Sequence, residues 1–151
     1  MSFRPDKFTV KSQEAVQAAQ QFAESKGHRQ LVPLHLLHSL IAEADGVPRA
    51  LLHKIGVNFS QLTKMLDAEL GRLPSSSGSN VPLQGSAEIM QVFDAAQKLA
   101  TQMQDSFVST EHLLLALAGT PSKAQDSLQL NAITKDKILA ALQSVRGSAR
   151  V

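Results

Sequence analysis

The chain has 151 residues, with 15 Lys or Arg against 13 Asp or Glu, and therefore a net charge of +2. This balance gives no strong field for nucleic acid or an anionic membrane, and the only aromatic residues available to stack on bases are six Phe. Because Cys is absent, disulfides and thiolate metal sites are excluded, which fits a reducing compartment such as the cytoplasm.

Residues 1–8 are interpreted as an N-terminal tail, and Thr9 is suited to cap the first helix. Its apolar residues recur with helical spacing on one face. They are Ala15, Val16, Ala19, Phe22 and Ala23. The same stripe returns 77 positions later, at Val92, Phe93, Ala96, Leu99 and Ala100. The chain therefore contains an internal repeat.

The second helix of each copy follows the same offset. Residues 31–40, which contain Pro-Leu-His-Leu-Leu, match residues 108–117, which contain Thr-Glu-His-Leu-Leu, again at a distance of 77. Pro33 suits a first helical turn, and Ser109 can cap the equivalent helix. The longest uncharged apolar run, at 113–118, is far too short to span a bilayer, so we expect a soluble protein without a membrane partner.

Two further helices are predicted in each copy. One covers Pro48–Ile55 and ends at Gly56, with a counterpart near 122–130. The other begins at Asn58, where Gln61 is placed for a capping box, and its counterpart follows Thr134. We therefore expect four helices in each copy.

The domain organisation follows from this repeat. Repeat 1 is assigned to residues 9–71 and repeat 2 to 85–145, while the Ser-, Gly- and Pro-rich residues 72–84 predict a flexible linker. A unit of roughly 70 residues buries only a marginal core by itself, so the copies should pack against each other. The predicted fold class is all-α, with eight helices as two pseudo-twofold-related four-helix repeats.

The tandem arrangement, with its Pro-Leu-His-Leu and Glu-His-Leu-Leu-Leu-Ala-Leu helices, resembles the Clp amino-terminal repeat domain over nearly the whole chain. Residues 70–74 and 145–151 are most similar to the ClpB branch, whose members are AAA+ disaggregases. The resemblance implies a substrate-engaging domain of an ATP-driven homohexamer that acts on unfolded or aggregated polypeptides with a DnaK-type chaperone. Residues 146–151 would then lead towards the first ATPase module.

The chain itself contains no Gly-Lys dipeptide and therefore no P-loop. ATP and Mg²⁺ are accordingly expected only in a full-length parent protein. We expect this fragment to be a monomer with no cofactor and no catalytic site of its own.

The resemblance also implies that Thr9, Asp105 and Glu111 engage the substrate. Each residue has a purely structural alternative. Thr9 could be a helix cap and nothing more, and Asp105 could be a solvated loop carboxylate. Glu111 could be present only because a carboxylate is stabilised at the positive end of the helix dipole. The offset of 77 pairs Glu111 with Leu34 and Asp105 with His28, so the two carboxylates occur only in the second copy. This asymmetry favours one binding surface, since a role required by the repeat fold should appear in both copies.

Carboxylates alone cannot hold unfolded chains of arbitrary sequence, so an exposed apolar groove is also predicted. Val10, Phe93 and His112 are its candidate residues. A patch of about 400 Å² would supply roughly 10 kcal/mol, which the cost of association largely offsets. Binding should therefore be weak, micromolar or poorer, and unselective.

Two alternatives stay open. A ClpA- or ClpC-type domain would dock a folded adaptor instead of unfolded substrate. A hydrolase or metal-dependent enzyme would use the linker serines or His35 and His38, which are spaced i, i+3 on one helix. The chain lacks the Gly-x-Ser-x-Gly and His-Glu-x-x-His signatures of such enzymes, so no metal site is assigned.

Overall fold

The computed structural model of the chain describes residues 4–76 and 82–147. Within these ranges there are eight α-helices, which confirms the predicted fold class. In repeat 1 they are α1 (Val10–Ser25), α2 (Pro33–Ala42), α3 (Val47–Ile55) and α4 (Phe59–Gly71). In repeat 2 they are α5 (Ala87–Gln102), α6 (Thr110–Gly119), α7 (Lys123–Leu130) and α8 (Lys135–Arg146). None of the helices in the described ranges is both long and apolar enough to cross a membrane.

The helix boundaries follow local capping signals. Thr9 accepts a hydrogen bond from the Ser12 backbone N–H, and Asn58 accepts one from the Gln61 N–H, as the sequence predicts. At the other end of α3, Gly56 adopts the left-handed conformation with φ of +94°, which favours glycine and ends the helix. The helices begin 77 residues apart for α1 and α5 and 76 residues apart for α4 and α8.

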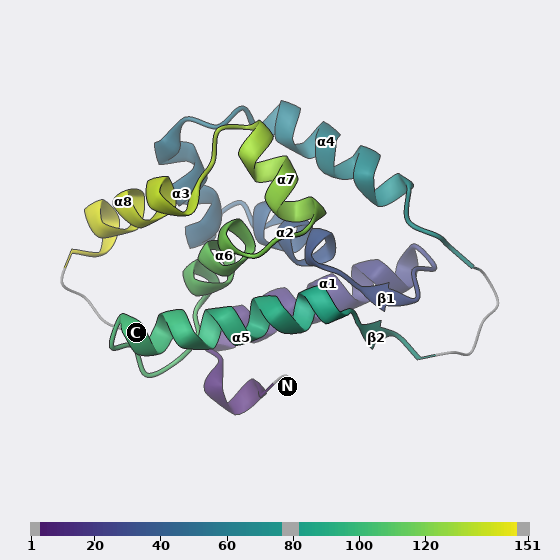
Figure 1. Ribbon diagram of the computed structural model, residues 1–151, viewed down its shortest axis with the longest axis horizontal. Helices are drawn as coiled ribbons and strands as arrows, with labels where there is room; N and C mark the ends of the chain where they lie inside the picture. The colour runs from purple at the N-terminus through teal and green to yellow at the C-terminus, as the bar shows by residue number, and fades with distance from the viewer. Residues whose placement is uncertain (1–3, 77–81, 148–151) are drawn as a thin grey trace.

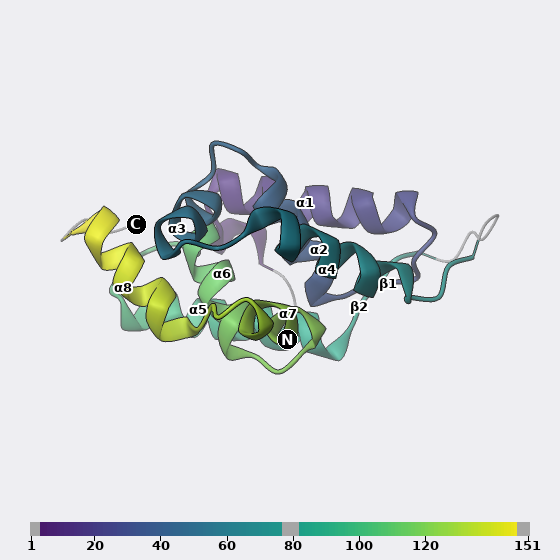
Figure 2. The same ribbon diagram turned by 90° about the horizontal axis from the view of Figure 1, so that it is seen from above.

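The two central helices, α2 and α6, form the middle of one shared core. In Figure 1, α1 and α5 lie below them, whereas α3, α4, α7 and α8 lie above. The view in Figure 2 places α1 and α5 on opposite sides of this centre. Both central helices are buried almost all round, as their continuous apolar sequences require. Contacts of α3 with α8 and of α4 with α7 join the repeats, so the predicted packing of the two copies is confirmed.

The segment before the first helix of each repeat pairs with the opposite repeat. The strand β1 (Gln30–Leu31) runs parallel to β2 (Gln84–Gly85), and Phe8 forms an equivalent parallel bridge to Val108. The Ser86 N–H donates to the Leu31 carbonyl at 3.0 Å, and the Thr9 N–H donates to the Val108 carbonyl at 2.9 Å. The copies therefore exchange their first residues across the pseudo-twofold axis.

This exchange corrects the interpretation of residues 1–8 as a tail. Pro5–Lys7 form a short 3₁₀ helix, and Phe8 is only 3% exposed because its ring packs edge-on against Phe93. Residues 1–3 lie outside the described residues.

The two ends of residues 72–84, which the sequence predicts to be a flexible linker, are also held in place. Ser75 forms an antiparallel bridge to His28, and Gln84 belongs to β2, so both ends are held by backbone pairing. Residues 77–81 lie outside the described residues. At the end of repeat 2, α8 extends to Arg146, one residue beyond the predicted boundary.

Candidate functional site

Each repeat contains a buried histidine that caps its own central helix. The N–H of Val32 donates to Nδ1 of His35 at 3.0 Å, and the N–H of Ser109 donates to Nδ1 of His112 at 2.8 Å. Because Nδ1 accepts in both cases, the hydrogen-bond pattern assigns the proton to Nε2. Both histidines are therefore packed helix residues with a hydrogen-bonded ring nitrogen.

The Nε2 atoms also have equivalent partners. His35 Nε2 lies 2.8 Å from Nδ1 of His28, and His112 Nε2 lies 2.7 Å from Oδ2 of Asp105. Burial lowers the pKa of His35 to about 4, with the neighbouring charges of His28 and His38 acting in the same direction. Burial also lowers the pKa of His112, against the opposing effect of Asp105. Both imidazoles are therefore neutral near pH 7.

The environment of Asp105 differs from a solvated loop carboxylate. Its side chain is fully buried, and its Oδ2 contacts Nη2 of Arg146 at 2.8 Å as well as His112. Since His28 supplies the same acceptor in repeat 1, the asymmetry argument for a binding role does not hold for Asp105. The asymmetry argument does hold for Glu111 and Arg146. Their counterparts in repeat 1, Leu34 and Leu70, are buried and apolar.

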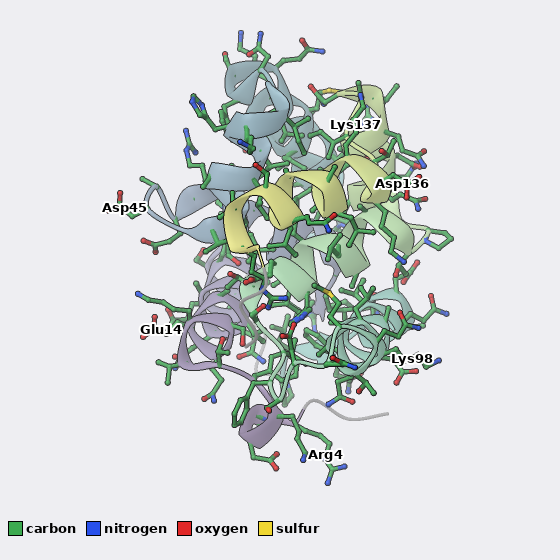
Figure 3. The ribbon with its side chains drawn as sticks, turned by 90° about the vertical axis from the view of Figure 1, so that its left-hand side faces the viewer. Arg4, Glu14, Asp45, Lys98, Asp136 and Lys137 are labelled. Carbon is green, nitrogen blue, oxygen red and sulfur yellow. The ribbon has the colours of Figure 1, made fainter. Side chains whose placement is uncertain are left out.

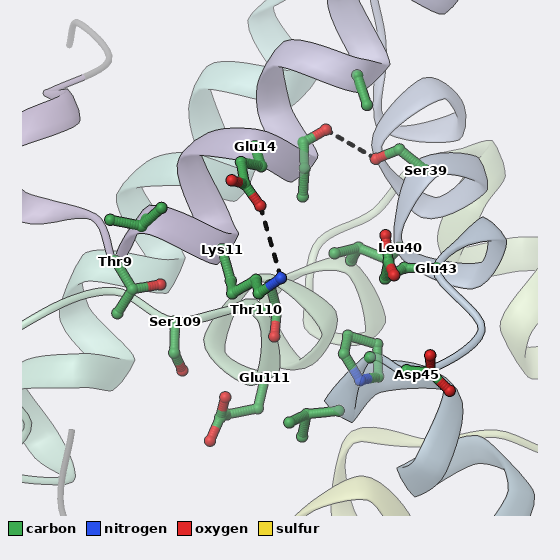
Figure 4. A pocket seen from close by; sticks show the side chains of 16 residues that line it. Thr9, Lys11, Glu14, Ser39, Leu40, Glu43, Asp45, Ser109, Thr110 and Glu111 are labelled. Atoms are coloured by element: carbon green, nitrogen blue, oxygen red, sulfur yellow. Dashed lines mark hydrogen bonds and ion pairs between the residues drawn. The ribbon is translucent and has the colours of Figure 1, made fainter.

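An open groove lies between α1, the start of α3 and the N-terminal end of α6. Its cavity volume is about 490 Å³, within the usual range for ligand sites. Figure 4 shows Thr9, Ser109 and Glu111 at one end and Asp45 at the other. Val10 and Val47 also line the groove and are 69% and 39% exposed, respectively. The groove therefore offers apolar side chains to solvent beside polar ones.

The groove is acidic. Among the described residues, its lining contains four carboxylates, from Glu14, Glu43, Asp45 and Glu111, but only one basic side chain, Lys11. Lys11 Nζ lies 3.8 Å from Glu14 Oε1, and both side chains are more than half exposed, so this ion pair contributes little to stability. Figure 3 shows Glu14 and Asp45 projecting from the same side of the molecule.

The predicted site residues fall into two groups. Thr9, Val10 and Glu111 line the groove together. In contrast, Phe93 and His112 are 2% and 0% exposed, because both side chains face the core. They cannot form an exposed apolar surface, and the prediction that they do so is corrected.

Sequence reasoning did not identify Val47 or Arg146. Like Val10, Val47 is an apolar residue at the first position of a helix, where its side chain is exposed, but the sequence predicted that helix to begin one residue later, at Pro48. Arg146 had no signal in the sequence, because its partners Asp105 and Glu111 lie 41 and 35 residues earlier in the chain.

The alternative metal pair does not converge in space. Both ring nitrogens of His35 already contact other groups, and the His38 ring stacks on Phe22 with centroids 4.0 Å apart and an interplanar angle of 6°. Among the residues that the structure describes, no group of three or more His, Asp or Glu side chains is placed to hold a metal ion.

Residues 7–131 match the family model described as the Clp repeat N-terminal domain. Chaperone protein ClpB of Rhodopirellula baltica is 39% identical over 151 residues, which is 100% of this chain and 17% of that protein. Chaperone protein ClpB of Mycobacterium bovis is 36% identical over 150 residues, or 99% of this chain and 17% of that protein. The crystal structure of the Hsp104 N-terminal domain from Candida albicans superposes with a TM-score of 0.84 and 25% identity, covering 95% of this chain and 94% of that one. The chain thus spans about a sixth of the length of these two ClpB relatives.

Proposed function

The chain belongs to the Clp repeat N-terminal domain family, and we propose that its groove between α1, α3 and α6 engages unfolded or aggregated polypeptide for a ClpB-type chaperone. One observation carries this proposal. Val10 and Val47 expose apolar surface in a groove that also contains the hydroxyl of Thr9 and the carboxylate of Glu111. Apolar surface can bind many sequences, while the polar groups can pair with backbone or side-chain donors.

The groove should bind weakly. Full burial of one valine side chain contributes about 1.5–3 kcal/mol, whereas association costs about 4–15 kcal/mol. Two valines contribute at most about 6 kcal/mol, which barely exceeds the lowest cost of association, so polar contacts must add to them and the dissociation constant should be micromolar or weaker. The excess of carboxylates favours segments with Lys or Arg over segments with Asp or Glu.

An NMR titration tests the groove directly. We expect a permanently unfolded polypeptide to cause saturable amide shifts around Val10 and Val47. Val10→Asn should weaken binding roughly tenfold, since it removes the most exposed apolar contact. Leu130→Asn is a matched control, because Leu130 is also 69% exposed but lies at the end of α7, outside the groove lining.

The outcomes separate the competing functions. Equal weakening by Val10→Asn and Leu130→Asn would reject this groove as the binding surface. No shifts at millimolar polypeptide would redirect the search to a folded adaptor of the ClpA or ClpC type. The match to ClpB relatives favours the ClpB branch over that alternative.

The activity of the whole protein is a further part of the proposal. Because the chain spans 17% of its ClpB relatives, we assign ATP and Mg²⁺, homohexamer formation and cooperation with a DnaK-type chaperone to a full-length cytoplasmic parent. The Val10→Asn substitution in that parent should slow recovery of an aggregated reporter enzyme while leaving ATP hydrolysis unchanged. A parallel loss of ATP hydrolysis would contradict this separation of roles.

A further inference from the structure

Arg146 joins the end of α8 to the wall of the groove. It is the last residue of that helix, and its side chain is only 10% exposed. Its Nη2 atom lies 2.8 Å from Oδ2 of Asp105 and 3.5 Å from Oε2 of Glu111. This buried Nη2 makes no hydrogen bond of good geometry within the described residues, so charge attraction dominates both contacts.

Among the described residues, Arg146 is the one cation that contacts both carboxylates, those of Asp105 and Glu111. His112 is uncharged near neutral pH, because burial lowers its pKa, and therefore adds no second positive charge. Attraction between charges is much stronger in a buried setting than in water, and so is the cost of an unpaired charge. Arg146 is closer to Asp105 than to Glu111, which leaves Glu111 with the weaker of the two contacts.

Glu111 also faces the groove, whereas Asp105 does not line it. A donor group in the groove can therefore compete with Arg146 for the Glu111 carboxylate. Repeat 1 has buried leucines, Leu34 and Leu70, at the positions equivalent to Glu111 and Arg146. The arrangement is thus confined to the end of the molecule that carries the groove.

We propose that Arg146 is a positioning residue for the groove: it holds the Glu111 carboxylate at the wall, and a bound polypeptide that draws Glu111 away loosens the last turn of α8. The second half of this proposal rests on the proposed function of the groove. Asp105 then acts through Arg146, as its anchor, and does not contact the substrate.

The first experiment needs no ligand. The Gly147 N–H donates to the Gln143 carbonyl at 2.9 Å and reports on the last turn of α8 by amide hydrogen exchange. Glu111→Gln should speed exchange at residues 145–147 by roughly 3- to 10-fold, the effect of losing one partly buried ion pair. Glu14→Gln is the matched control, because it also removes a groove carboxylate but one whose ion pair is with Lys11.

Substitution of Arg146 itself distinguishes positioning from general stability. Arg146→Lys keeps the charge and should retain most of the protection of the amides at 145–147 from hydrogen exchange. Arg146→Gln should lose this protection, while hydrogen exchange in α5 stays unchanged. An effect of Glu111→Gln no larger than that of Glu14→Gln would overturn the role of Arg146. So would equal loss of protection throughout the domain in Arg146→Gln and Arg146→Lys.

The second experiment adds a saturating unfolded polypeptide. In the wild-type domain we expect faster exchange at residues 145–147, and in Glu111→Gln no further change. Groove shifts without any response in α8 would overturn the coupling and leave the proposed function intact. Absence of groove shifts would reject the proposed function, and the ligand-free comparison would still decide whether Arg146 holds Glu111.

Discussion

The two repeats make the same buried histidine hydrogen bonds with different partner residues. His35 and His112 both accept a hydrogen bond from the N-cap N–H through Nδ1, and both donate one to another side chain through Nε2. That acceptor is a neutral imidazole in repeat 1, from His28, and a carboxylate in repeat 2, from Asp105. A required hydrogen bond can therefore be conserved between repeats although the residue type is not.

Acid should destabilise the domain through His35. The ordinary histidine pKa of 6.5 applies to the unfolded chain, and burial lowers the folded-state pKa to about 4. The unfolded state therefore binds more protons between these values, and the free energy of unfolding falls as pH decreases from 6.5 towards 4. The full effect is of the order of 3 kcal/mol, at about 1.4 kcal/mol for each pKa unit.

Urea unfolding at several pH values measures this effect. His35→Asn keeps an acceptor near the Nδ1 position but removes the titrating group. The variant should be less stable than the wild type at pH 7.5, and its stability should depend less on pH between 6.5 and 4. Identical pH slopes for the two proteins would contradict the assignment of His35 as a buried neutral imidazole.

At the level of the helices, the start of α1 combines capping with a place in the groove. Thr9 Oγ1 accepts from the Ser12 N–H at 3.2 Å, and Thr9 also lines the groove. Ser86 caps α5 in the same way, with its Oγ accepting from the Ile89 N–H at 3.1 Å. Ser86 is not part of the groove lining, so the repeat provides a control for capping alone.

Thr9→Ala and Ser86→Ala should each lower the free energy of unfolding by about 1 kcal/mol, the usual contribution of an N-cap. Only Thr9→Ala should also weaken binding of an unfolded polypeptide, while Thr9→Ser should restore both properties. Chemical denaturation and NMR titration measure the two effects separately. Unchanged binding in Thr9→Ala, at temperatures where the variant stays folded, would show that Thr9 is only a cap.

For the molecule as a whole, the exchanged segments hold the repeats together. Phe8 precedes α1 but pairs with Val108 of repeat 2, and β2 precedes α5 but pairs with β1 of repeat 1. Each repeat therefore completes the other, in addition to sharing its core. This explains how two units of marginal size form one stable domain.

Phe8→Ala should destabilise the domain by roughly 3 kcal/mol or more, because it removes a buried ring from the shared core. Phe107→Ala is a suitable control, since Phe107 adjoins Val108 in sequence but is 46% exposed. Its cost should stay below about 1 kcal/mol. Urea denaturation compares the two variants, and equal costs would show that Phe8 does not join the repeats.

The repeat, the eight helices and several of their caps could be predicted from the amino-acid sequence alone. These features depend on residues within one or two turns of each other, such as Thr9 with Ser12 or Asn58 with Gln61, so their signals are local. Thr9 and Glu111 were named through the family resemblance and Val10 as an apolar candidate, and all three line the same groove.

Which side chains reach that groove depends on long-range packing and could not be predicted from the sequence. Asp105 and Arg146 come from different segments, and Phe8 meets Val108, which lies 100 residues later in the chain. Burial of Phe93 and His112 likewise depends on what packs against their helices, because helical spacing shows which residues share a face but not what covers it. Long-range packing therefore determines which residues line the groove, such as Glu111, and which ones only support them, such as Asp105 and Arg146.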